Sequence, residues 1–416
     1  MTPAPTARRR TAAPVRYTRR ISLTERSYLM AALMAPPMAI QVFVEGAGSI
    51  DPDRLTRAVA IASAACPGAR VVRRGPNWVD GGQPPPVTVL DGALIDRRTY
   101  DSERLRRPFD PARGPNCEVL LLTGSPATVV FRAFHAVMDG KGVMTWITEV
   151  FRALRGESPV GAASTETEEG LVARFAATAT ATARPADGPA PEQAPVRSPF
   201  EQLPAGPEEP DAELDGWLWR RRSVPGSYPG LVARAAVAIT TASGADGRFM
   251  VPVSLRRHDP ALLSTANLTL PVQLEVPLGS RWRAVQGRLV QAMMEGRELT
   301  ADGPREGNVQ LSSFAGLAPA LAAARSAGDR RAGYHASAIL SELGRPDLAG
   351  LSAEGFAART VYSLPMYVPY APAFLTMYQL PDQVELALSC RRGPGAGARA
   401  EALLDRISDE LTHPQA

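Results

Sequence analysis

One stretch of the chain decides its fold class: TVVFRAFHAVMDGKG, residues 128–142. Its first seven residues, 128–134, are mostly β-branched and aromatic, which is typical of a buried strand. Beyond the stretch, apolar residues recur at the spacing of one helix face: Val143, Ile147, Val150, Phe151 and Leu154. The order of strand, loop and helix predicts an α/β unit that holds His135 where the strand ends.

His135 is the candidate catalytic residue. An imidazole with an ordinary pKa of about 6.5 can take a proton from a hydroxyl or an amine at neutral pH. Asp139, four residues further on, can fix the loop by pairing with an arginine or with amides at the helix N-terminus. Gly140 and Gly142 flank Lys141 and lack side chains, so a ligand can approach the backbone closely there. This combination suits a narrow tunnel.

The remaining histidines and the cysteines form no metal-ligand pattern. Three further histidines are expected to be structural or solvated: His258, His335 and His413. The odd, sparse set of cysteines indicates reduced thiols and a cytoplasmic location, with each thiol buried as a small apolar group: Cys66, Cys117 and Cys390. No metal site is therefore expected.

Composition sets the outer limits. With 416 residues, 45% of them hydrophobic, the chain can bury a large core and is long enough for two lobes. The formal net charge is +4, and the arginines are dispersed among acids without an aromatic-interleaved basic block, so a nucleic-acid partner is not expected. No uninterrupted apolar run reaches the roughly 18 residues of a membrane span.

Changes in composition divide the chain into four parts. Residues 1–14 are rich in arginine and proline and are expected to be a disordered tail. Residues 15–155 form an N-terminal lobe that carries the histidine motif. Residues 156–216 are rich in Ala, Pro, Thr and Glu and are expected to be a partly disordered crossover linker with one helix at 169–177. Residues 217–416 form the C-terminal lobe.

Periodicity predicts the main elements. In the first lobe we expect a short core helix at 28–35, a strand at 39–44 and a helix that begins after Asp51. Strands of the second lobe are expected at 248–253, 268–276, 336–340, 374–378 and 384–390. Its helices are expected at 228–242, 282–295, 314–327 and 399–411.

The pattern His-x-x-x-Asp-Gly at residues 135–140 resembles the active-site motif of the chloramphenicol-acetyltransferase-like superfamily. That superfamily includes non-ribosomal peptide condensation domains, polyketide-associated and alcohol acyltransferases, and plant-type CoA acyltransferases. Further segments in both halves are similar to its other motifs: 21–26, 66–72, 108–115, 251–256 with Asn267, and 341–344. The resemblance covers residues 20–412.

The chain departs from the family pattern at two positions. The family usually has two adjacent histidines, and the first, generally structural, is Phe134 here. The Ser-Asn-Leu-Gly turn reads Ser341, Glu342, Leu343 and Gly344, so a carboxylate replaces an amide. If that amide normally orients the substrate, the second departure puts the acceptor and the reaction type in question.

The resemblance implies an α/β (α+β) fold with mixed sheets, in which two related lobes form a V-shaped pseudo-dimer around a central tunnel. His135 would be the general base near the middle of that tunnel. Asp139 would form a buried ion pair with Arg256, chosen over Arg257, and Gly140 would support the loop. The resemblance also indicates substrate-binding residues: Gly142, Asn267, Ser341 and Glu342.

In such a protein an acyl group passes from a thioester to a hydroxyl or amine acceptor in secondary metabolism. The donor would be acyl-CoA or a phosphopantetheinyl carrier thioester, and no tightly bound cofactor is implied. The partners would be a small-molecule acceptor and, for a carrier thioester, an acyl or peptidyl carrier protein. Arginine supplies nearly all the basic charge of the chain. Arginine binds phosphate groups bidentately, so these residues could bind CoA or an acidic carrier surface. Alternatively, the arginines are ordinary solvated surface residues. We expect a monomer.

Two other function classes stay open. A condensation-like enzyme can keep the fold and catalyse a cyclisation, dehydration or rearrangement with His135 as acid or base. A non-catalytic module can recruit a carrier protein, as the changes at Phe134 and Glu342 suggest. The intact His135, Asp139 and Gly140 argue against this last class, because a docking surface has no use for a tunnel histidine.

Overall fold

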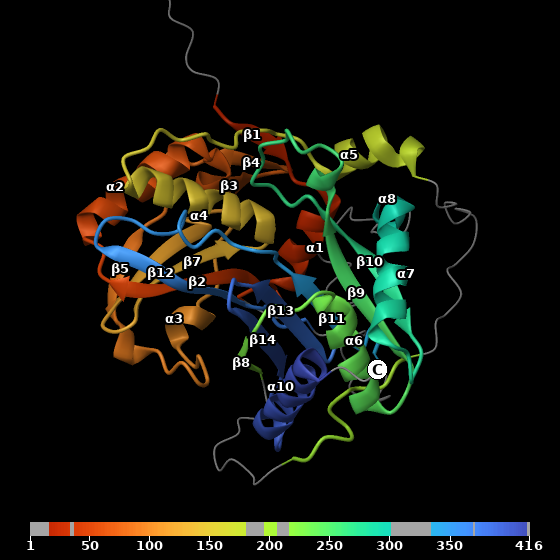
Figure 1. The fold of residues 1–416 in the computed structure, drawn as a ribbon. Helices are drawn as coiled ribbons and strands as arrows, with labels where there is room; N and C mark the ends of the chain where they lie inside the picture. Colours follow the sequence, from red (N-terminus) through yellow and green to blue (C-terminus); the bar gives the residue numbers. More distant parts are fainter. Residues whose placement is uncertain are drawn as a thin grey trace, which may run out of the picture.

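The computed structural model describes residues 16–33, 37–179, 195–205, 216–300, 334–368 and 371–413. Within these residues the strands form three sheets, and the two large sheets belong to the two lobes (Figure 1). Both large sheets contain parallel and antiparallel pairs: β5 runs parallel to β6, and β11 runs parallel to β9 and β13. The mixed α/β fold class expected from the sequence is confirmed.

The N-terminal lobe is built on the sheet with strand order β12-β2-β7-β6-β5. Its strands are β12 (Phe356–Leu364), β2 (Ala39–Gly48), β7 (Ala127–Phe134), β6 (Cys117–Thr123) and β5 (Val87–Asp91). A small sheet adds β1 (Thr18–Arg20), β4 (Asn77–Asp80) and β3 (Val71–Arg74). The helices are α1 (Leu23–Ala31), α2 (Pro52–Ala65), α3 (Glu103–Arg106) and α4 (Gly140–Leu154).

β7 and α4 confirm the strand, loop and helix expected around His135. Every residue of β7 is buried, and α2 and α4 lie side by side over the sheet (Figure 1). The predicted apolar face of α4 belongs to the main core of the lobe: Val143, Ile147, Val150, Phe151 and Leu154. The rigid strand and the rigid helix therefore position the loop between them.

The C-terminal lobe is built on the sheet with strand order β10-β9-β11-β13-β14-β8. Its strands are β10 (Thr269–Val276), β9 (Gly247–Ser254), β11 (Ala338–Glu342), β13 (Ala373–Gln379), β14 (Gln383–Arg391) and β8 (Trp217–Pro225). Apolar residues of α6 (Leu231–Ser243), α7 (Trp282–Met294) and α10 (Ala396–Thr412) share one core with this sheet. Among the described residues, the remaining α-helices are α5 (Glu168–Phe175), from the crossover segment, and the short α8 (Arg297–Thr300).

β12 is the strand that the sequence patterns did not predict. Its residues come from the second half of the chain, but it pairs antiparallel with β2 of the first lobe, from Phe356 opposite Gly48 to Leu364 opposite Gln41. The strand is at the sheet edge, and its register shifts between Ala358 and Thr360. This irregularity explains why the segment lacks a clean two-residue alternation.

The other predicted elements agree with the structure to within a few residues, apart from the first helix. α1 begins at Leu23, five residues before the predicted start at 28, because Ser22 and Glu25 form a capping box there. α6 begins at Leu231 after Gly230, which adopts the left-handed conformation with φ of 69°. The predicted helix 314–327 and tail 1–14 lie outside the described residues, as do 180–194 and 206–215 of the linker. None of the described helices has the length and apolar character of a membrane span.

Candidate active site

His135 follows the last residue of β7, and both halves of the chain hold its backbone. Its N–H donates to the carbonyl of Met38 at 2.9 Å, and its own carbonyl accepts a hydrogen bond from the Asn267 side chain at 2.7 Å. Tyr28 of α1 stacks on the imidazole, with 4.1 Å between ring centroids and 26° between planes. The ring is therefore fixed by a strand end, a helix and a residue of the C-terminal lobe.

The imidazole of His135 is set up to stay neutral. Burial lowers its pKa below the ordinary value, and nearby hydrogen-bonding groups and the Asp139 carboxylate only partly offset this effect. Within the described residues, its buried Nδ1 atom has no hydrogen-bond partner of good geometry, although the backbone carbonyls of His135 and Met138 are near enough to affect the pKa of the ring. A neutral imidazole with an unpaired nitrogen can accept a proton.

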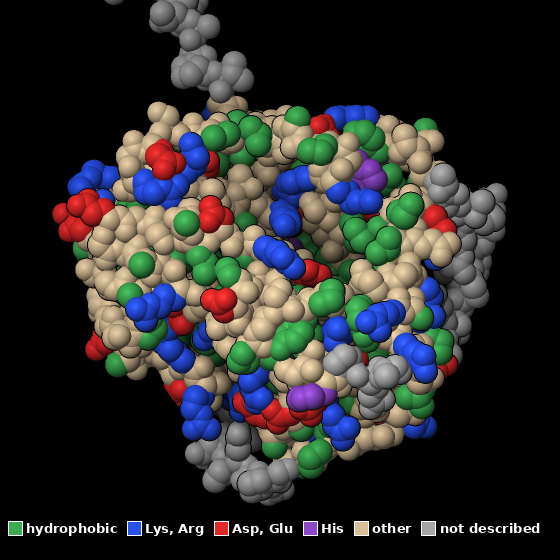
Figure 2. Space-filling model, viewed as in Figure 1, with side chains coloured by type: hydrophobic (Ala, Val, Ile, Leu, Met, Phe, Trp, Pro, Cys, Tyr) green, Lys and Arg blue, Asp and Glu red, His purple; other side chains and the backbone are tan. Residues whose placement is uncertain are grey.

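A small cavity of about 50 Å³ adjoins His135. Residues of both lobes line it: Ile40, Val42, His135, Gly140, Ser341, Leu343, Ser363, Leu364, Pro365, Met366, Phe374, Thr376 and Tyr378. Figure 2 shows a hollow near the middle of the viewed face, between α4 and the strands β9 and β10, with basic side chains at its rim. The tunnel expected to pass through the molecule stays a prediction, because this cavity is smaller than an acyl thioester.

Asp139 caps α4 and ties it to the other lobe. Its carboxylate accepts hydrogen bonds from the backbone N–H of Gly142 at 2.7 Å, and from the backbone N–H of Leu268 and the hydroxyl of Thr269 at 2.8 Å each. Arg256 Nη1 lies 2.8 Å from the same carboxylate. Burial alone would raise the pKa of Asp139, but Arg256 and the N–H donors hold it below its usual range. Asp139 is thus a charged structural anchor rather than a group open to substrate.

Arg256 lies in the short turn that follows β9, and most of its donors bond to protein. Nε and Nη2 donate to the carbonyl of Ser264 at 3.2 and 3.0 Å, and Nη2 also donates to the carbonyl of Ala266 at 2.7 Å. The structure therefore brings Asp139 and Arg256 together. Arg257 contacts Glu298 instead, at 2.5 Å.

The two motif glycines have different surroundings. Gly140 lines the cavity, and a Cβ atom there would lie 2.8 Å from Cδ2 of Leu343. Gly142 lies outside the cavity lining, and a Cβ atom there would come within 2.1 Å of the carbonyl oxygen of Thr265. Gly142 therefore allows the two lobes to approach closely, and Asn267 likewise holds the His135 backbone rather than lining the cavity.

The turn after β11 brings one of its two candidate residues to the cavity. Ser341 lines the cavity together with Leu343, whereas Glu342 is exposed and lies outside the lining. Partial burial of the Glu342 carboxyl raises its pKa, against the opposing effects of Arg345 and Lys141. Glu342, whose carboxylate replaces the amide of the family pattern, therefore has basic neighbours but does not line the cavity.

No protein-family model and no curated protein matches the chain. Solved structures do match it along nearly its whole length. The first condensation domain of the calcium-dependent antibiotic synthetase, in complex with a substrate analogue, is 16% identical with a TM-score of 0.64, over 97% of this chain and 98% of that chain. The condensation domain of the Monacolin K polyketide synthase MokA is 13% identical with a TM-score of 0.60, over 95% and 98% of the two chains.

A third match is a variant of the starter condensation domain of the rhizomide synthetase RzmA, in complex with C8-CoA and Leu-SNAC. It is 15% identical with a TM-score of 0.59, over 96% of this chain and 95% of that chain. The chain has the condensation-domain fold. The fold that the resemblance implied is thereby confirmed.

In this fold, the buried ion pair of Arg19 and Glu25 contacts the loop that follows His135. Arg19 donates to the carbonyl of Val137 at 2.8 Å and pairs with Glu25 at 2.7 Å. Glu25 also accepts hydrogen bonds from Trp78 Nε1 at 3.1 Å and from the Asn267 side chain at 3.4 Å. Sequence analysis did not single out Arg19 and Glu25, although the Ser-x-x-Glu capping pattern before an apolar run was a usable signal for Glu25.

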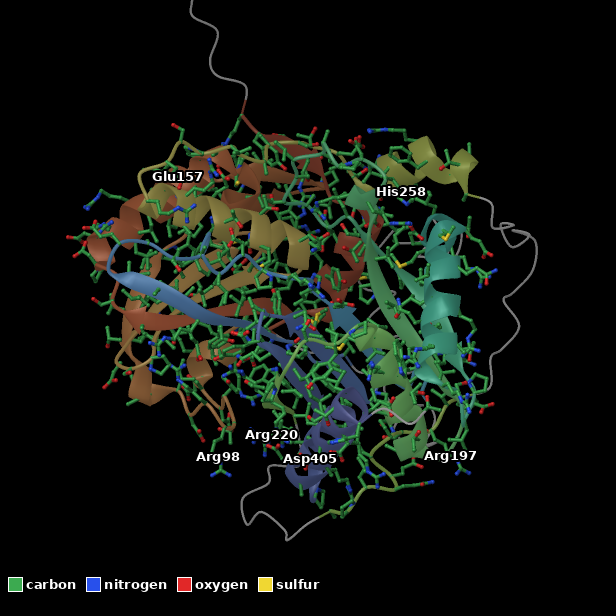
Figure 3. The ribbon with its side chains drawn as sticks, viewed as in Figure 1. Arg98, Glu157, Arg197, Arg220, His258 and Asp405 are labelled. Carbon is green, nitrogen blue, oxygen red and sulfur yellow. The ribbon has the colours of Figure 1, made fainter. Side chains whose placement is uncertain are left out.

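His258 has structural contacts, as expected from the sequence. It lies beside α5, with its ring stacked on Phe175 at 5.6 Å between centroids (Figure 3). Its Nε2 atom lies 2.8 Å from the Glu298 carboxylate. The described residues contain no cluster of three or more His, Cys, Asp or Glu side chains arranged to bind a metal ion.

Proposed function

We propose that this protein is an acyltransferase that moves an acyl group from a thioester to a hydroxyl or amine acceptor, with His135 as the general base. One observation carries the proposal: an imidazole with a lowered pKa and an unpaired nitrogen lines a cavity between the two lobes. The condensation-domain fold supports the same reaction class by analogy.

The reaction needs only one proton to be relayed. His135 removes the proton of the acceptor as the acceptor oxygen or nitrogen attacks the thioester carbonyl carbon. The new C–O or C–N bond forms, the C–S bond of the tetrahedral intermediate breaks, and the proton passes from the imidazolium to the departing thiolate. No acyl-enzyme is required.

The donor is a thioester of coenzyme A or of a phosphopantetheinyl carrier protein. The RzmA starter domain was solved with C8-CoA, which favours a thioester donor for a site of this fold. Basic side chains at the rim of the hollow are suited to phosphate groups or to an acidic carrier surface (Figure 2). The acceptor is a small molecule, no tightly bound cofactor takes part, and the protein acts as a cytoplasmic monomer.

The other motif residues act by positioning. Asp139 and Arg256 hold the start of α4 against the C-terminal lobe, and Gly140 leaves room beside His135. Gly142 and Asn267 keep the two lobes close at the loop. Of the substrate-binding candidates, Ser341 is the one whose place in the cavity wall supports contact with substrate.

Thiol release from a panel of acyl-CoA and acyl-carrier-protein donors, with hydroxyl and amine acceptors, tests the proposal. We expect His135→Ala to lower the transfer rate by about 10²- to 10⁴-fold with folding intact. His413→Ala, an exposed histidine at the end of α10, is the matched control and should keep full activity. Full activity in His135→Ala would overturn the proposal, as would carrier-protein binding without turnover of any donor.

A further inference from the structure

β13 presents alternate side chains to two different environments. Ala373, Leu375 and Met377 belong to the core beneath the C-terminal sheet. The intervening residues, Phe374, Thr376 and Tyr378, line the cavity beside His135. This two-residue alternation is what a strand with two covered faces produces. Tyr378 therefore reaches the candidate active site from a rigid strand.

The hydroxyl of Tyr378 is a buried donor without a partner. The residue is 1% exposed, and within the described residues its hydroxyl oxygen makes no hydrogen bond. Burial raises its pKa, and no charged group contributes to that shift, so the hydroxyl keeps its proton across the physiological range. Buried hydroxyls normally find a partner, so an unpaired one in a cavity wall is a candidate to bind a ligand there.

A neighbouring hydroxyl does not share this property. Thr376, two residues earlier on the same face of β13, donates to the carbonyl of Ser363 at 2.5 Å. Among the described residues, the Tyr378 hydroxyl and Nδ1 of His135 are buried without a hydrogen-bond partner, and both residues line this cavity. The cavity of about 50 Å³ is small, and His135 and Tyr378 both belong to its wall.

We propose that the Tyr378 hydroxyl is the catalytic hydrogen-bond donor to the thioester carbonyl oxygen and to the oxyanion that this oxygen becomes. The inference rests on the proposed acyl transfer. As His135 takes the proton of the acceptor, negative charge develops on the carbonyl oxygen, and a fixed donor in a water-poor site stabilises that charge. Tyr378 keeps its own proton throughout. When the C–S bond breaks, the oxyanion returns to a carbonyl and the thiolate receives the proton from His135.

The cavity wall also has an apolar part. Phe374 and Met366 line the cavity and belong to a small apolar cluster. This lining favours an unsubstituted aliphatic acyl group over a charged or peptidyl one.

Tyr378→Phe is the decisive variant, because it removes the hydroxyl and keeps the ring. The control is Tyr100→Phe: Tyr100 is also a fully buried tyrosine, but its hydroxyl interacts with Tyr362 and Arg221 and it lies outside the cavity lining. We expect Tyr378→Phe to lower kcat by about 10²-fold with KM and Tm nearly unchanged, as for loss of one oxyanion donor. Tyr100→Phe should leave kcat unchanged. Equal kcat for Tyr378→Phe and the unmodified protein would overturn the inference.

A binding measurement separates this inference from the proposed function. Two unreactive pantetheine analogues of equal chain length are compared by calorimetry: a ketone, which keeps the carbonyl, and a thioether, which lacks it. We expect the unmodified protein to bind the ketone about fivefold to tenfold more tightly, and Tyr378→Phe to lose this preference. A preference that persists in Tyr378→Phe, or that is absent from the unmodified protein, would refute the role of Tyr378.

The two hypotheses can fail independently. If the ketone preference depends on Tyr378 but no donor of the panel releases thiol, the acyl transfer is wrong and the carbonyl-binding role of Tyr378 stands. If thiol is released and both kcat and the ketone preference are the same in Tyr378→Phe, acyl transfer stands and Tyr378 is only a packing residue.

Discussion

Asp139 and Arg256 form an ion pair between the two lobes, with 2.8 Å between the carboxylate oxygen and the guanidinium nitrogen. Asp139 lies at the end of the loop that carries His135. The carboxylate belongs to the first residue before α4, and the guanidinium belongs to the turn after β9. The ion pair therefore ties the N-terminus of α4, which follows the histidine loop, to the C-terminal lobe.

Removing Arg256 should destabilise the whole protein. In Arg256→Ala the Asp139 carboxylate stays buried without its counter-charge, which typically costs about 3–5 kcal/mol. Urea unfolding followed by circular dichroism measures the loss. Glu354→Ala is the control, because it breaks an exposed pair with Arg54 and should change stability by less than about 1 kcal/mol. Equal unfolding midpoints for the two variants would show that the buried pair contributes nothing.

Adding one methyl group at Gly142 should push the lobes apart. The Cβ atom of Gly142→Ala would come within 2.1 Å of the backbone oxygen of Thr265, so the backbone must shift, at a cost of about 1–3 kcal/mol. Gly287→Ala in α7 is the control: its Cβ meets nothing within 4 Å, and alanine is the better helix former by about 0.5–1 kcal/mol. Differential scanning calorimetry should show opposite shifts in Tm. A Tm of Gly142→Ala at or above that of the unmodified protein would contradict the close approach.

The rate of transfer should be flat at neutral pH and fall only in acid. Burial lowers the pKa of His135, and the base works in its neutral form, so kcat/KM rises with pH through an inflection below about 6.5. A pH–rate profile from pH 4.5 to 8 locates the inflection, and NMR titration of the imidazole, assigned with His135→Ala, checks that the same group titrates. An inflection above 6.5 would mean that the ring is not buried as described.

Glu168 should make the protein less stable as the pH rises. It accepts a hydrogen bond from the N–H of Thr24 at 2.8 Å, at the start of α1, while its second carboxyl oxygen is buried without a hydrogen-bond partner in the described residues. Burial raises its pKa to about 8. The folded protein therefore keeps a proton that the unfolded chain releases near pH 4.3, and stability declines with pH across that window.

Glu168→Gln removes this titration. The variant should match the unmodified protein near pH 4 and exceed its Tm increasingly up to pH 9. Glu169→Gln is the comparison, because Glu169 bonds the adjacent N–H of Leu23 at 2.7 Å from a less buried position. The prediction fails if the difference in Tm between Glu168→Gln and the unmodified protein is the same at pH 5 and pH 9.

The sequence predicted what depends on local pattern. The apolar spacing after residue 142 identified α4, and the alternating or continuous apolar runs identified β9, β10, β13 and β14 within a few residues. The motif at 135–140 identified His135 and Asp139, and the resemblance to a known family implied Arg256 as the partner of Asp139. Apart from the pairing with Arg256, which rests on the resemblance, these signals are local or depend on a short pattern with fixed spacing.

The residues that were missed owe their role to tertiary placement. Tyr28 and Tyr378 are single aromatic residues in apolar segments, where a core position is the ordinary interpretation. Only the folded chain shows that one stacks on His135 and that the other brings an unpaired hydroxyl to the same cavity. β12 was missed for a related reason, since an edge strand from a distant part of the chain has no local partner to indicate it.

The path of β12 limits how the protein can be taken apart. Residues 356–364 form the edge strand β12 of the N-terminal sheet. A single cut in the linker therefore separates β12 from the other strands of that sheet. A fragment ending before β12 leaves β2 as a bare sheet edge, open to pairing with other chains. Co-expressed halves should therefore regain solubility only as a complex, which makes the chain a natural candidate for a split-protein reporter.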